Sequence, residues 1–246
     1  MQILIPMAGR GQRFADKGYT FPKPLIDVAG KPMIQRVVDN FPFPDAEFIF
    51  LVQKEHRENF NLDDTLHTIV GRRPCQIITV DGVTEGAACT ALLADDALDP
   101  NQELIIANSD QFVRFSVNNF NTLRANTAGC AGIIFTFNAV HPKWSFARAI
   151  EDTGVVLEVA EKKPISNIAT CGIYYYASAA HFVAGAREMI RKNIRTNNEF
   201  YIAPVYNEII NGEEDVVLTF FVDEMFGMGT PEDLETFLMY HGKNLS

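Results

Sequence analysis

Short apolar segments alternate along this chain with segments of helical periodicity, and this order limits the fold more than any other feature. "QILIPM" (2–7) and "EFIFLVQ" (47–53) are apolar runs bounded by turn residues, as buried strands usually are. Between them, residues 32–41 carry apolar side chains at helical spacing behind an initial proline. Strands that alternate with helices predict a mostly parallel sheet covered by helices on both faces.

The same alternation continues to the end of the chain. Further strands are predicted at 75–80, 103–108, 131–137, 154–161, 171–177 and 216–222, and further helices at 86–94, 116–124, 178–192, 203–211 and 231–241. A chain of 246 residues can form one substantial core. We therefore predict a single domain over residues 1–246, an α/β three-layer sandwich with a Rossmann-like, mostly parallel but mixed central sheet.

The composition excludes several classes of partner. A formal net charge of −10 and the lack of a basic stripe argue against binding to nucleic acid or to an anionic membrane. No apolar run reaches the roughly 18 residues of a membrane span, and the amino terminus does not match a secretory signal, so a cytoplasmic location is expected. The four cysteines are far apart in the sequence and are expected to be buried free thiols.

The charge is unevenly distributed. Residues 1–36 hold six basic and two acidic side chains, so this segment carries about +4 and the remainder about −14. The segment includes a glycine loop, "AGRGQRF" (8–14), which lacks the third glycine of a dinucleotide fingerprint. A glycine loop is often only a turn, but here backbone N–H groups could approach a phosphate closely, with Arg13 and Lys23 as fixed positive charges.

A second candidate site follows a later strand. "ELIIANSDQF" (103–112) places Ser109 and Asp110 at the carboxyl end of an apolar strand, where open parallel sheets bind ligands. A carboxylate there could hold Mg²⁺ together with substrate phosphates. The alternative is that Asp110 only caps the next helix or turn. Two further segments are not specific by themselves. Residues 159–166 are typical of a charged turn, and residues 222–234 are typical of the start of a helix.

Taken in order and at these separations, the segments resemble the family of nucleotidyltransferases that activate sugar phosphates, whose fold is glycosyltransferase-A-like. The resemblance spans nearly the whole chain. It rests on Gly9-Arg10-Gly11-Gln12-Arg13, Pro22-Lys23-Pro24-Leu25, "TEGAACTAL" (84–92), Asp110, Lys163-Pro164 and Gly229-Thr230-Pro231-Glu232. Each motif is weak alone, and their collinearity is what makes the resemblance specific.

The resemblance implies a Mg²⁺-dependent enzyme that transfers a nucleoside monophosphate from a nucleoside triphosphate to a phosphorylated sugar or similar small acceptor, releasing pyrophosphate. It implies a role in making precursors of surface polysaccharides. Arg13 and Lys23 would stabilise the charge that develops on the phosphates, and Asp110 would hold the metal. The implied nucleotide-binding residues are Met7, Ala8, Gly9, Arg10, Gly11, Glu85, Gly86 and Ser109, and the implied acceptor-binding residues are Glu161, Lys162 and Lys163.

Two departures from the family pattern matter. Where many members carry a second metal-binding aspartate, this chain has Gly227, so either Asp223 or Glu224 replaces it or the metal relies on Asp110 and phosphates. We assign Asp223 to the metal. The usual Glu-Glu-Lys-Pro turn has Lys162 in place of its second glutamate, so the acceptor is expected to be more anionic than a hexose phosphate, or not a sugar.

Two other functions remain open from the sequence. A glycosyltransferase that uses a nucleotide-sugar donor shares the fold, and "NSD" (108–110) could mimic its acidic metal motif. The glycine loop and the Pro-Lys-Pro segment argue against it, because such an enzyme needs no triphosphate loop. A non-catalytic nucleotide-binding regulatory protein is the other alternative, given Gly227. The base, the acceptor and any association into homo-oligomers are not determined by the sequence.

Overall fold

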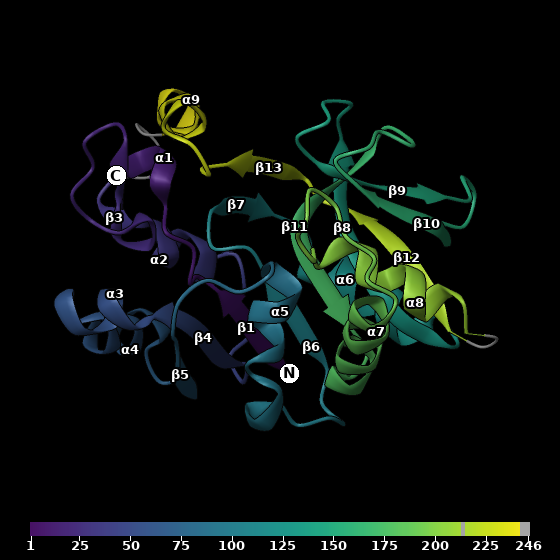
Figure 1. Cartoon of the computed structure of the whole chain (residues 1–246). Helices are drawn as coiled ribbons and strands as arrows, with labels where there is room; N and C mark the ends of the chain where they lie inside the picture. Colours follow the sequence, from purple (N-terminus) through teal and green to yellow (C-terminus); the bar gives the residue numbers. More distant parts are fainter. Residues whose placement is uncertain (213–214, 242–246) are drawn as a thin grey trace.

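A mixed β-sheet forms the centre of the molecule in the computed structural model, which describes residues 1–212 and 215–241 (Figure 1). Its main path follows the order β12, β8, β11, β6, β1, β4, β5, and every neighbouring pair is parallel except the two pairs that involve β11. These strands are β1 (Gln2–Pro6), β4 (Glu47–Gln53), β5 (Cys75–Val80), β6 (Leu104–Ala107), β8 (Cys130–Asn138), β11 (Ile168–Tyr176) and β12 (Val216–Phe221).

Shorter strands extend this sheet or form small ribbons beside it. The antiparallel pair β9 (Ser145–Ala149) and β10 (Val156–Glu161) joins the sheet at β11. A separate antiparallel ribbon consists of β7 (Gln111–Arg114) and β13 (Glu224–Gly227), and another of β2 (Asp27–Val28) and β3 (Lys31–Pro32). In the ribbon of β7 and β13, β7 is the next strand after β6 in the chain. Its pairing with β13 brings the carboxyl-terminal part of the chain back to the centre.

Helices cover both faces of the sheet, which confirms the predicted three-layer α/β sandwich. Successive strand residues point to opposite faces, so Leu4 packs into one core while Ile3 and Ile5 pack into the other. The first core is closed by α5 (Ala87–Leu92), α7 (Ala179–Arg191) and α8 (Tyr206–Ile210). The second is closed by α2 (Met33–Val38), α4 (Leu62–Val70) and α6 (Val117–Asn126), and α3 (Lys54–Asn59) precedes α4.

A third, smaller core joins the two ends of the chain. It packs the short helix α1 (Gln12–Ala15) against the last helix, α9 (Pro231–His241), as Figure 1 shows. Its buried side chains are Phe14, Ile26, Val28, Met33, Met228, Leu234 and Phe237. This packing places the turn that begins α9 beside the loop that follows β1.

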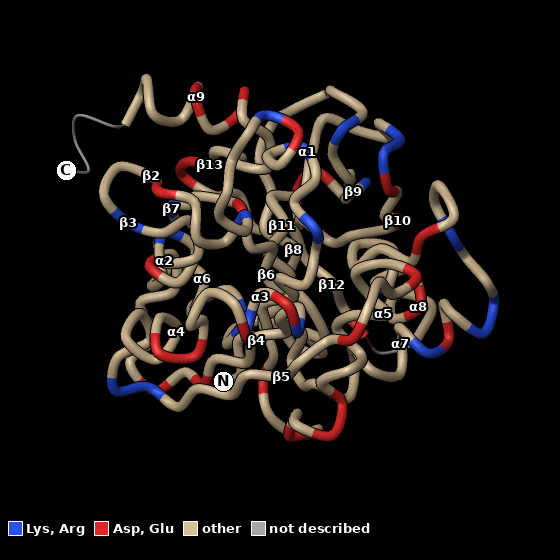
Figure 2. The backbone as a smooth tube through the Cα atoms, turned by 60° about the vertical axis from the view of Figure 1, so that its left-hand side comes forward, with Lys and Arg blue, Asp and Glu red and all other residues tan. Residues whose placement is uncertain are grey.

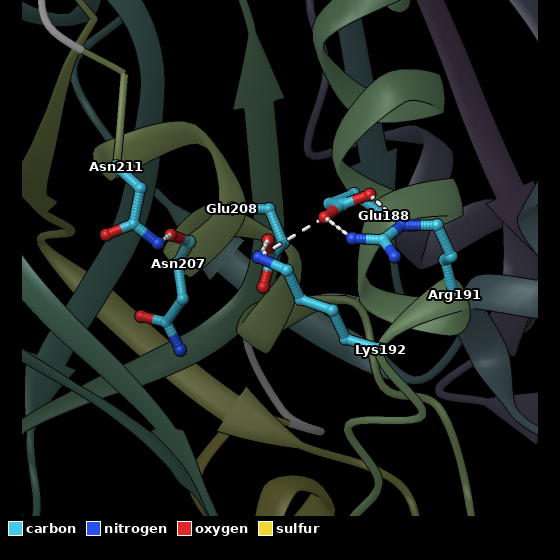
Figure 3. Close-up of polar contacts among 6 residues, drawn as sticks. All are labelled: Glu188, Arg191, Lys192, Asn207, Glu208 and Asn211. Atoms are coloured by element: carbon cyan, nitrogen blue, oxygen red, sulfur yellow. Dashed lines mark hydrogen bonds and ion pairs between the residues drawn. The ribbon is translucent and has the colours of Figure 1, made fainter.

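Helix α8 contacts the ribbon β9–β10 through hydrogen bonds to the backbone of β10. Asn207 accepts a hydrogen bond from the Val159 N–H and donates one to the Val159 carbonyl, each 2.8 Å long. Figure 3 shows how α8 is in turn tied to α7: the Lys192 ammonium lies 2.6 Å from Glu208 and 3.4 Å from Glu188. These contacts fix the end of β10, whose last residue is Glu161.

Most predicted elements are present with boundaries shifted by a few residues, but several were not predicted. The helices α3 and α4 were missed although Leu62, Leu66 and Val70 are buried at helical spacing. The segment 203–211 begins as a 3₁₀ turn, η3 (Ala203–Val205), before α8. The four cysteines are free thiols as predicted, but only Cys171 is fully buried.

Basic and acidic residues are mixed along the folded chain. Figure 2 shows lysine and arginine residues interspersed with aspartate and glutamate residues along the chain, with no continuous basic stripe in that view. Within residues 1–212 and 215–241, no helix has both the length and the apolar character that crossing a membrane requires.

Candidate active site

The loop after β1 lies where the carboxyl ends of the parallel strands meet. The Met7 N–H donates to the Leu51 carbonyl over 2.9 Å, and the side chain of Gln53 donates to the carbonyl oxygens of Ala8 and Gly82. The loop is therefore held to β4 by its backbone. Because Gly9 and Gly11 carry no side chain, their backbone faces a cavity directly.

Lys23 and Asp110 form an ion pair at the centre of this region. Lys23 begins the 3₁₀ turn η1 (Lys23–Leu25), and Asp110 lies between β6 and β7. Their side chains are 19% and 21% exposed, so the pair is sheltered but reachable from the cavity. The carboxylate of Asp110 faces Lys23 instead of capping a helix, and its backbone carbonyl accepts the Met228 N–H over 2.7 Å.

Three adjoining cavities form one continuous cleft. The central cavity, of about 360 Å³, is lined by the glycine loop, Arg13, Lys23, Ser109 and Asp110. On one side it shares Pro6 and Gly9 with a cavity of about 260 Å³, the glycine cavity, which contains Gly86. On the other side a cavity of about 350 Å³, the turn cavity, contains the turn after β10. The central and turn cavities share Arg13, Lys23, Asn108, Asp110 and Gly229.

Gly86, in the glycine cavity, has a backbone conformation and surroundings that leave no room for a side chain. Its φ of +133° is a conformation that side chains rarely allow, and a Cβ there would collide with the backbone of Phe200. The Ala88 N–H donates to the Phe200 carbonyl over 3.0 Å, and the Phe200 N–H donates to the Glu85 carbonyl over 2.8 Å. The backbone at Gly86 is thus clamped between α5 and the segment before η3.

Replacing Gly86 by alanine is expected to displace this clamp. The melting temperature should fall by more than about 4 °C, since strain of about 1 kcal/mol alone costs roughly 2–4 °C in a chain of this size. The KM for the nucleotide should rise about tenfold or more. Gly18→Ala is the matched control, because Gly18 has φ +84° but nothing within 4 Å of its missing Cβ. Equal effects of the two substitutions would show that strain alone is responsible and that the clamp is unimportant.

Glu85, predicted to bind nucleotide, lies outside the cleft. Its carboxylate is 67% exposed and pairs with Arg195 at 2.5 Å on the outer surface. Arg10 also lies apart from the central cavity, in an open hollow with Gln12 and Lys54. Among the residues predicted to bind nucleotide, the structure therefore brings together Met7, Ala8, Gly9, Gly11, Gly86 and Ser109 along the central and glycine cavities.

The turn after β10 places Lys162 in the cleft and Lys163 outside it. Lys162 has a left-handed backbone (φ +54°), and its N–H donates to the Trp144 carbonyl over 3.0 Å. Its ammonium contacts the Tyr201 hydroxyl and lies 4.5 Å from the centre of that ring. Lys163 is exposed and lines none of the three cavities, so the structure does not bring it to the position predicted for contact with the acceptor phosphate.

Glu161 is a partly buried carboxylate of the turn cavity. It accepts a hydrogen bond from Ser145. Burial raises the pKa of Glu161, and the Ser145 hydrogen bond and the charge of Lys162 offset this only in part. The carboxylate is therefore a group whose charged form the fold disfavours, at a position that faces the cleft.

Replacing Glu161 by glutamine is expected to stabilise the fold at neutral pH. Because the folded state raises the pKa of Glu161, the carboxylate costs stability above the folded pKa, and this cost disappears below the ordinary value of 4.5. The variant should therefore melt higher than the wild type near pH 8, and the gap should close as the pH falls to about 4. Glu151→Gln, at an exposed loop position, should show no gap at either pH. A lower melting temperature for Glu161→Gln at every pH would contradict this account.

Several lining residues of the turn cavity were not predicted from the sequence. Lys143 pairs with Asp233 at 3.0 Å, and Trp144 lies edge-on against Phe137. The side-chain oxygen of Gln111 is buried and has no hydrogen-bond partner among the residues that the structure describes. For Trp144, an aromatic residue in the polar loop before β9 was a usable signal.

The structure corrects the prediction that Asp223 binds a metal ion together with Asp110. In the antiparallel ribbon, Gly227 pairs with Gln111 and Glu224 pairs with Arg114, so Asp223 lies at the far end of β13 from Asp110. Three residues of strand correspond to about 10 Å. Glu224, the other candidate, pairs with Arg114 at 3.2 Å. Neither can share a metal ion with Asp110 in this arrangement.

Comparison with known proteins gives consistent matches. Residues 3–216 match the family model of nucleotidyl transferases. The chain is 24% identical over 178 residues to the bifunctional protein GlmU of Methanocaldococcus jannaschii, and 29% identical over 180 residues to mannose-1-phosphate guanylyltransferase 1 of Arabidopsis thaliana. These matches cover 72% and 71% of this chain but only 40% and 49% of the relatives' own lengths.

A solved structure extends the similarity over the whole fold. The nucleoside-diphosphate-sugar pyrophosphorylase from Vibrio cholerae RC9 superposes with a TM-score of 0.83 at 25% identity. The superposition covers 96% of this chain and 99% of that one.

Proposed function

Since the chain belongs to the nucleotidyl transferase family, as its sequence motifs had indicated, we propose that it transfers a nucleoside monophosphate from a nucleoside triphosphate to the phosphate of a small acceptor, most simply a sugar phosphate. The observation that carries this proposal is the shared wall of the cleft. Arg13, Lys23 and Asp110 line both the central and the turn cavity, so two phosphorylated molecules bound in these cavities would meet at the same three charged groups.

The reaction needs position and charge more than a nucleophilic side chain. An acceptor phosphate oxygen attacks the α-phosphorus, the bond to the oxygen bridging the α- and β-phosphates breaks, and that oxygen leaves with pyrophosphate. The glycine loop offers backbone N–H groups to the triphosphate, and Arg13 and Lys23 stabilise the charge that builds up on the oxygens. Gly86 and its neighbours would hold the base in the glycine cavity.

Mg²⁺ is part of the proposal. Such an ion is commonly bound by one or two carboxylates together with substrate phosphates, and Asp110 is a carboxylate at the junction of the two cavities. No cluster of three or more metal-binding side chains occurs within residues 1–212 and 215–241, which fits an ion that arrives with the nucleotide. When bound, the ion would neutralise phosphate charge. Asp110 would hold it, and Lys23, which lies beside Asp110, would supply a further positive charge to the phosphates.

The cellular role follows from the same proposal. An activated sugar or related compound is a building block for surface polysaccharides, and nucleoside triphosphates are available in the cytoplasm, where we place the protein. The name of one curated relative, mannose-1-phosphate guanylyltransferase 1, supports a sugar phosphate or similar acceptor. The base and the acceptor are left to experiment.

The test is a substrate screen read by pyrophosphate release. CTP, UTP, GTP and dTTP are each combined with a panel of phosphorylated sugars and small phosphorylated metabolites, with Mg²⁺ or with excess chelator. The proposal expects pyrophosphate from at least one pair, only when both substrates and Mg²⁺ are present. A glycosyltransferase or a non-catalytic binding protein would release none from any pair, and that result would overturn the proposal.

A further inference from the structure

We infer that Lys162 selects acceptors that carry a second anionic group, a carboxylate or another phosphate, in addition to the phosphate that reacts. The inference rests on the proposed function, because it concerns the acceptor of that reaction. It depends on which charges in the turn cavity are already compensated by protein partners and which are left for a ligand.

Most charged side chains of the turn cavity are paired. Lys23 is paired with Asp110, and Lys143 is paired with Asp233 at 3.0 Å. The remaining cations are Arg13 and Lys162. Neither forms an ion pair with a carboxylate in the part of the chain that the structure describes. Arg13 also lines the central cavity, where the reacting phosphates would meet, whereas Lys162 lines the turn cavity alone. Lys162 is therefore the cation available to the body of the acceptor.

The contact with Tyr201 positions this cation without neutralising it. The Lys162 ammonium contacts the hydroxyl of Tyr201 and lies 4.5 Å from the ring centre. Both interactions are with a neutral side chain, so they restrict the lysine without forming an ion pair. Two carboxylates lie nearby: Glu161, which accepts its hydrogen bond from Ser145, and Glu199, which is close to Tyr201. The charge of Lys162 favours the ionised form of Glu161, but neither carboxylate forms an ion pair with Lys162 in the described part of the chain. A restrained cation that forms no ion pair within residues 1–212 and 215–241 is suited to binding an anion.

The backbone supports a role in binding for Lys162. A non-glycine residue in the left-handed region costs about 1 kcal/mol or more, and such residues are concentrated at functional sites. At Lys162 this conformation is held by the hydrogen bond from its N–H to the Trp144 carbonyl. The resulting turn sends Lys162 into the cavity and leaves Lys163 exposed. An ordinary solvent-facing lysine would need neither the strained backbone nor the contact with Tyr201.

The test compares three probes that differ only at one carbon of the same sugar: glucose 1-phosphate, glucuronic acid 1-phosphate and glucose 1,6-bisphosphate. Their dissociation constants are measured by calorimetry with the wild type, Lys162→Met and Lys163→Met. Methionine removes the charge at similar length, and Lys163 is the exposed neighbour that serves as the control.

In the wild type and in Lys163→Met, at least one probe with a second anion should bind about tenfold or more tightly than glucose 1-phosphate, as a charge-assisted hydrogen bond allows. In Lys162→Met this advantage should fall below about twofold, while Lys162→Arg should retain it. Comparing glucuronic acid 1-phosphate with glucose 1,6-bisphosphate shows whether the protein prefers a carboxylate or a phosphate as the second anion. Equal binding of all probes by the wild type, or the same advantage in Lys162→Met, would overturn the inference. If Lys162→Met weakened every probe equally, Lys162 would contact the reacting phosphate and the inference would also fail.

The two proposals fail in different ways. Probe selectivity lost at Lys162, with no pyrophosphate from any substrate pair, would support the inference on the cavity and refute nucleotidyl transfer. Pyrophosphate release without selectivity for a second anion would do the reverse.

Discussion

Replacing Arg13 by alanine is expected to lower the turnover number of nucleotidyl transfer by about 100- to 1000-fold, the usual effect of removing one preorganised charge or donor from a developing anion. Arg13 lines both the central and the turn cavity. It has no ion-pair partner within the described ranges 1–212 and 215–241, so its charge is available to the phosphates. The loss should appear mainly in the turnover number and less in KM, because the charge on the oxygens grows in the transition state.

Lys17→Ala is the matched control for Arg13→Ala. Lys17 belongs to the same basic amino-terminal segment, but it pairs with Glu232 at 3.4 Å and is 61% exposed. Its loss should change turnover by less than about twofold, since an exposed ion pair contributes little. If the folded Arg13→Ala variant had wild-type kinetics, Arg13 would be removed from the site, and the basic loop would have to act through its backbone alone.

Replacing Asp110 by asparagine is expected to weaken the binding of divalent metal by more than about 100-fold, because losing even an outer-shell partner of a metal typically costs 10- to 100-fold. Turnover at ordinary Mg²⁺ concentrations should become undetectable. The fold should persist, because the side chain is 21% exposed and asparagine has almost the same shape. Binding of Mn²⁺ in the presence of nucleotide, followed by electron paramagnetic resonance, measures the metal site without depending on turnover.

Asp223→Asn is the control for this metal experiment. The sequence had assigned Asp223 to the metal, whereas the register of β7 and β13 places it at the far end of the ribbon. Asp223→Asn should therefore bind Mn²⁺ like the wild type. If Asp223→Asn lost Mn²⁺ and Asp110→Asn kept it, the metal site derived from the fold would be wrong.

The positions of most strands along the chain were predictable because they depend on local patterns. Apolar runs such as 47–53 and 103–108 are buried on both sides, and the sequence alone distinguishes such runs from amphipathic helices. Lys23 and Asp110 lie in segments that follow β1 and β6, and both segments lie at the carboxyl edge of the sheet. The two residues are 87 positions apart in the chain, yet they form an ion pair. Their proximity agrees with the rule that segments after parallel strands meet at the carboxyl edge of the sheet.

The orientation of the turn after β10 was not predictable in the same way. Lys162 and Lys163 both follow Glu161, the last residue of β10, so strand alternation does not determine which of the two faces the cleft. The choice depends on the bulge in β10 between Val156 and Glu158 and on the left-handed backbone at Lys162. A bulge adds one residue to one strand and exchanges the faces beyond it.

The second metal ligand was mispredicted for a related reason. Asp223 is only four residues before Gly227 in the sequence, but β13 is extended and pairs with β7, which carries Asp223 away from Asp110. The pairing of β13 with β7 is a contact between distant segments, and no local pattern specifies its register. Lys143 and Asp233 escaped prediction similarly, because they meet only when α9 packs against the amino-terminal segment.

The central claim is that the bond broken lies between the α- and β-phosphates of a nucleoside triphosphate and that the nucleotide ends on the acceptor. The most direct measurement uses the nucleotide and acceptor found by the substrate screen, with the nucleotide labelled with ³²P at either the α- or the γ-phosphate. We predict that the α-label moves to the acceptor product and that all of the γ-label leaves as pyrophosphate. Release of the γ-label as inorganic phosphate, or failure of the α-label to reach the acceptor, would contradict the account.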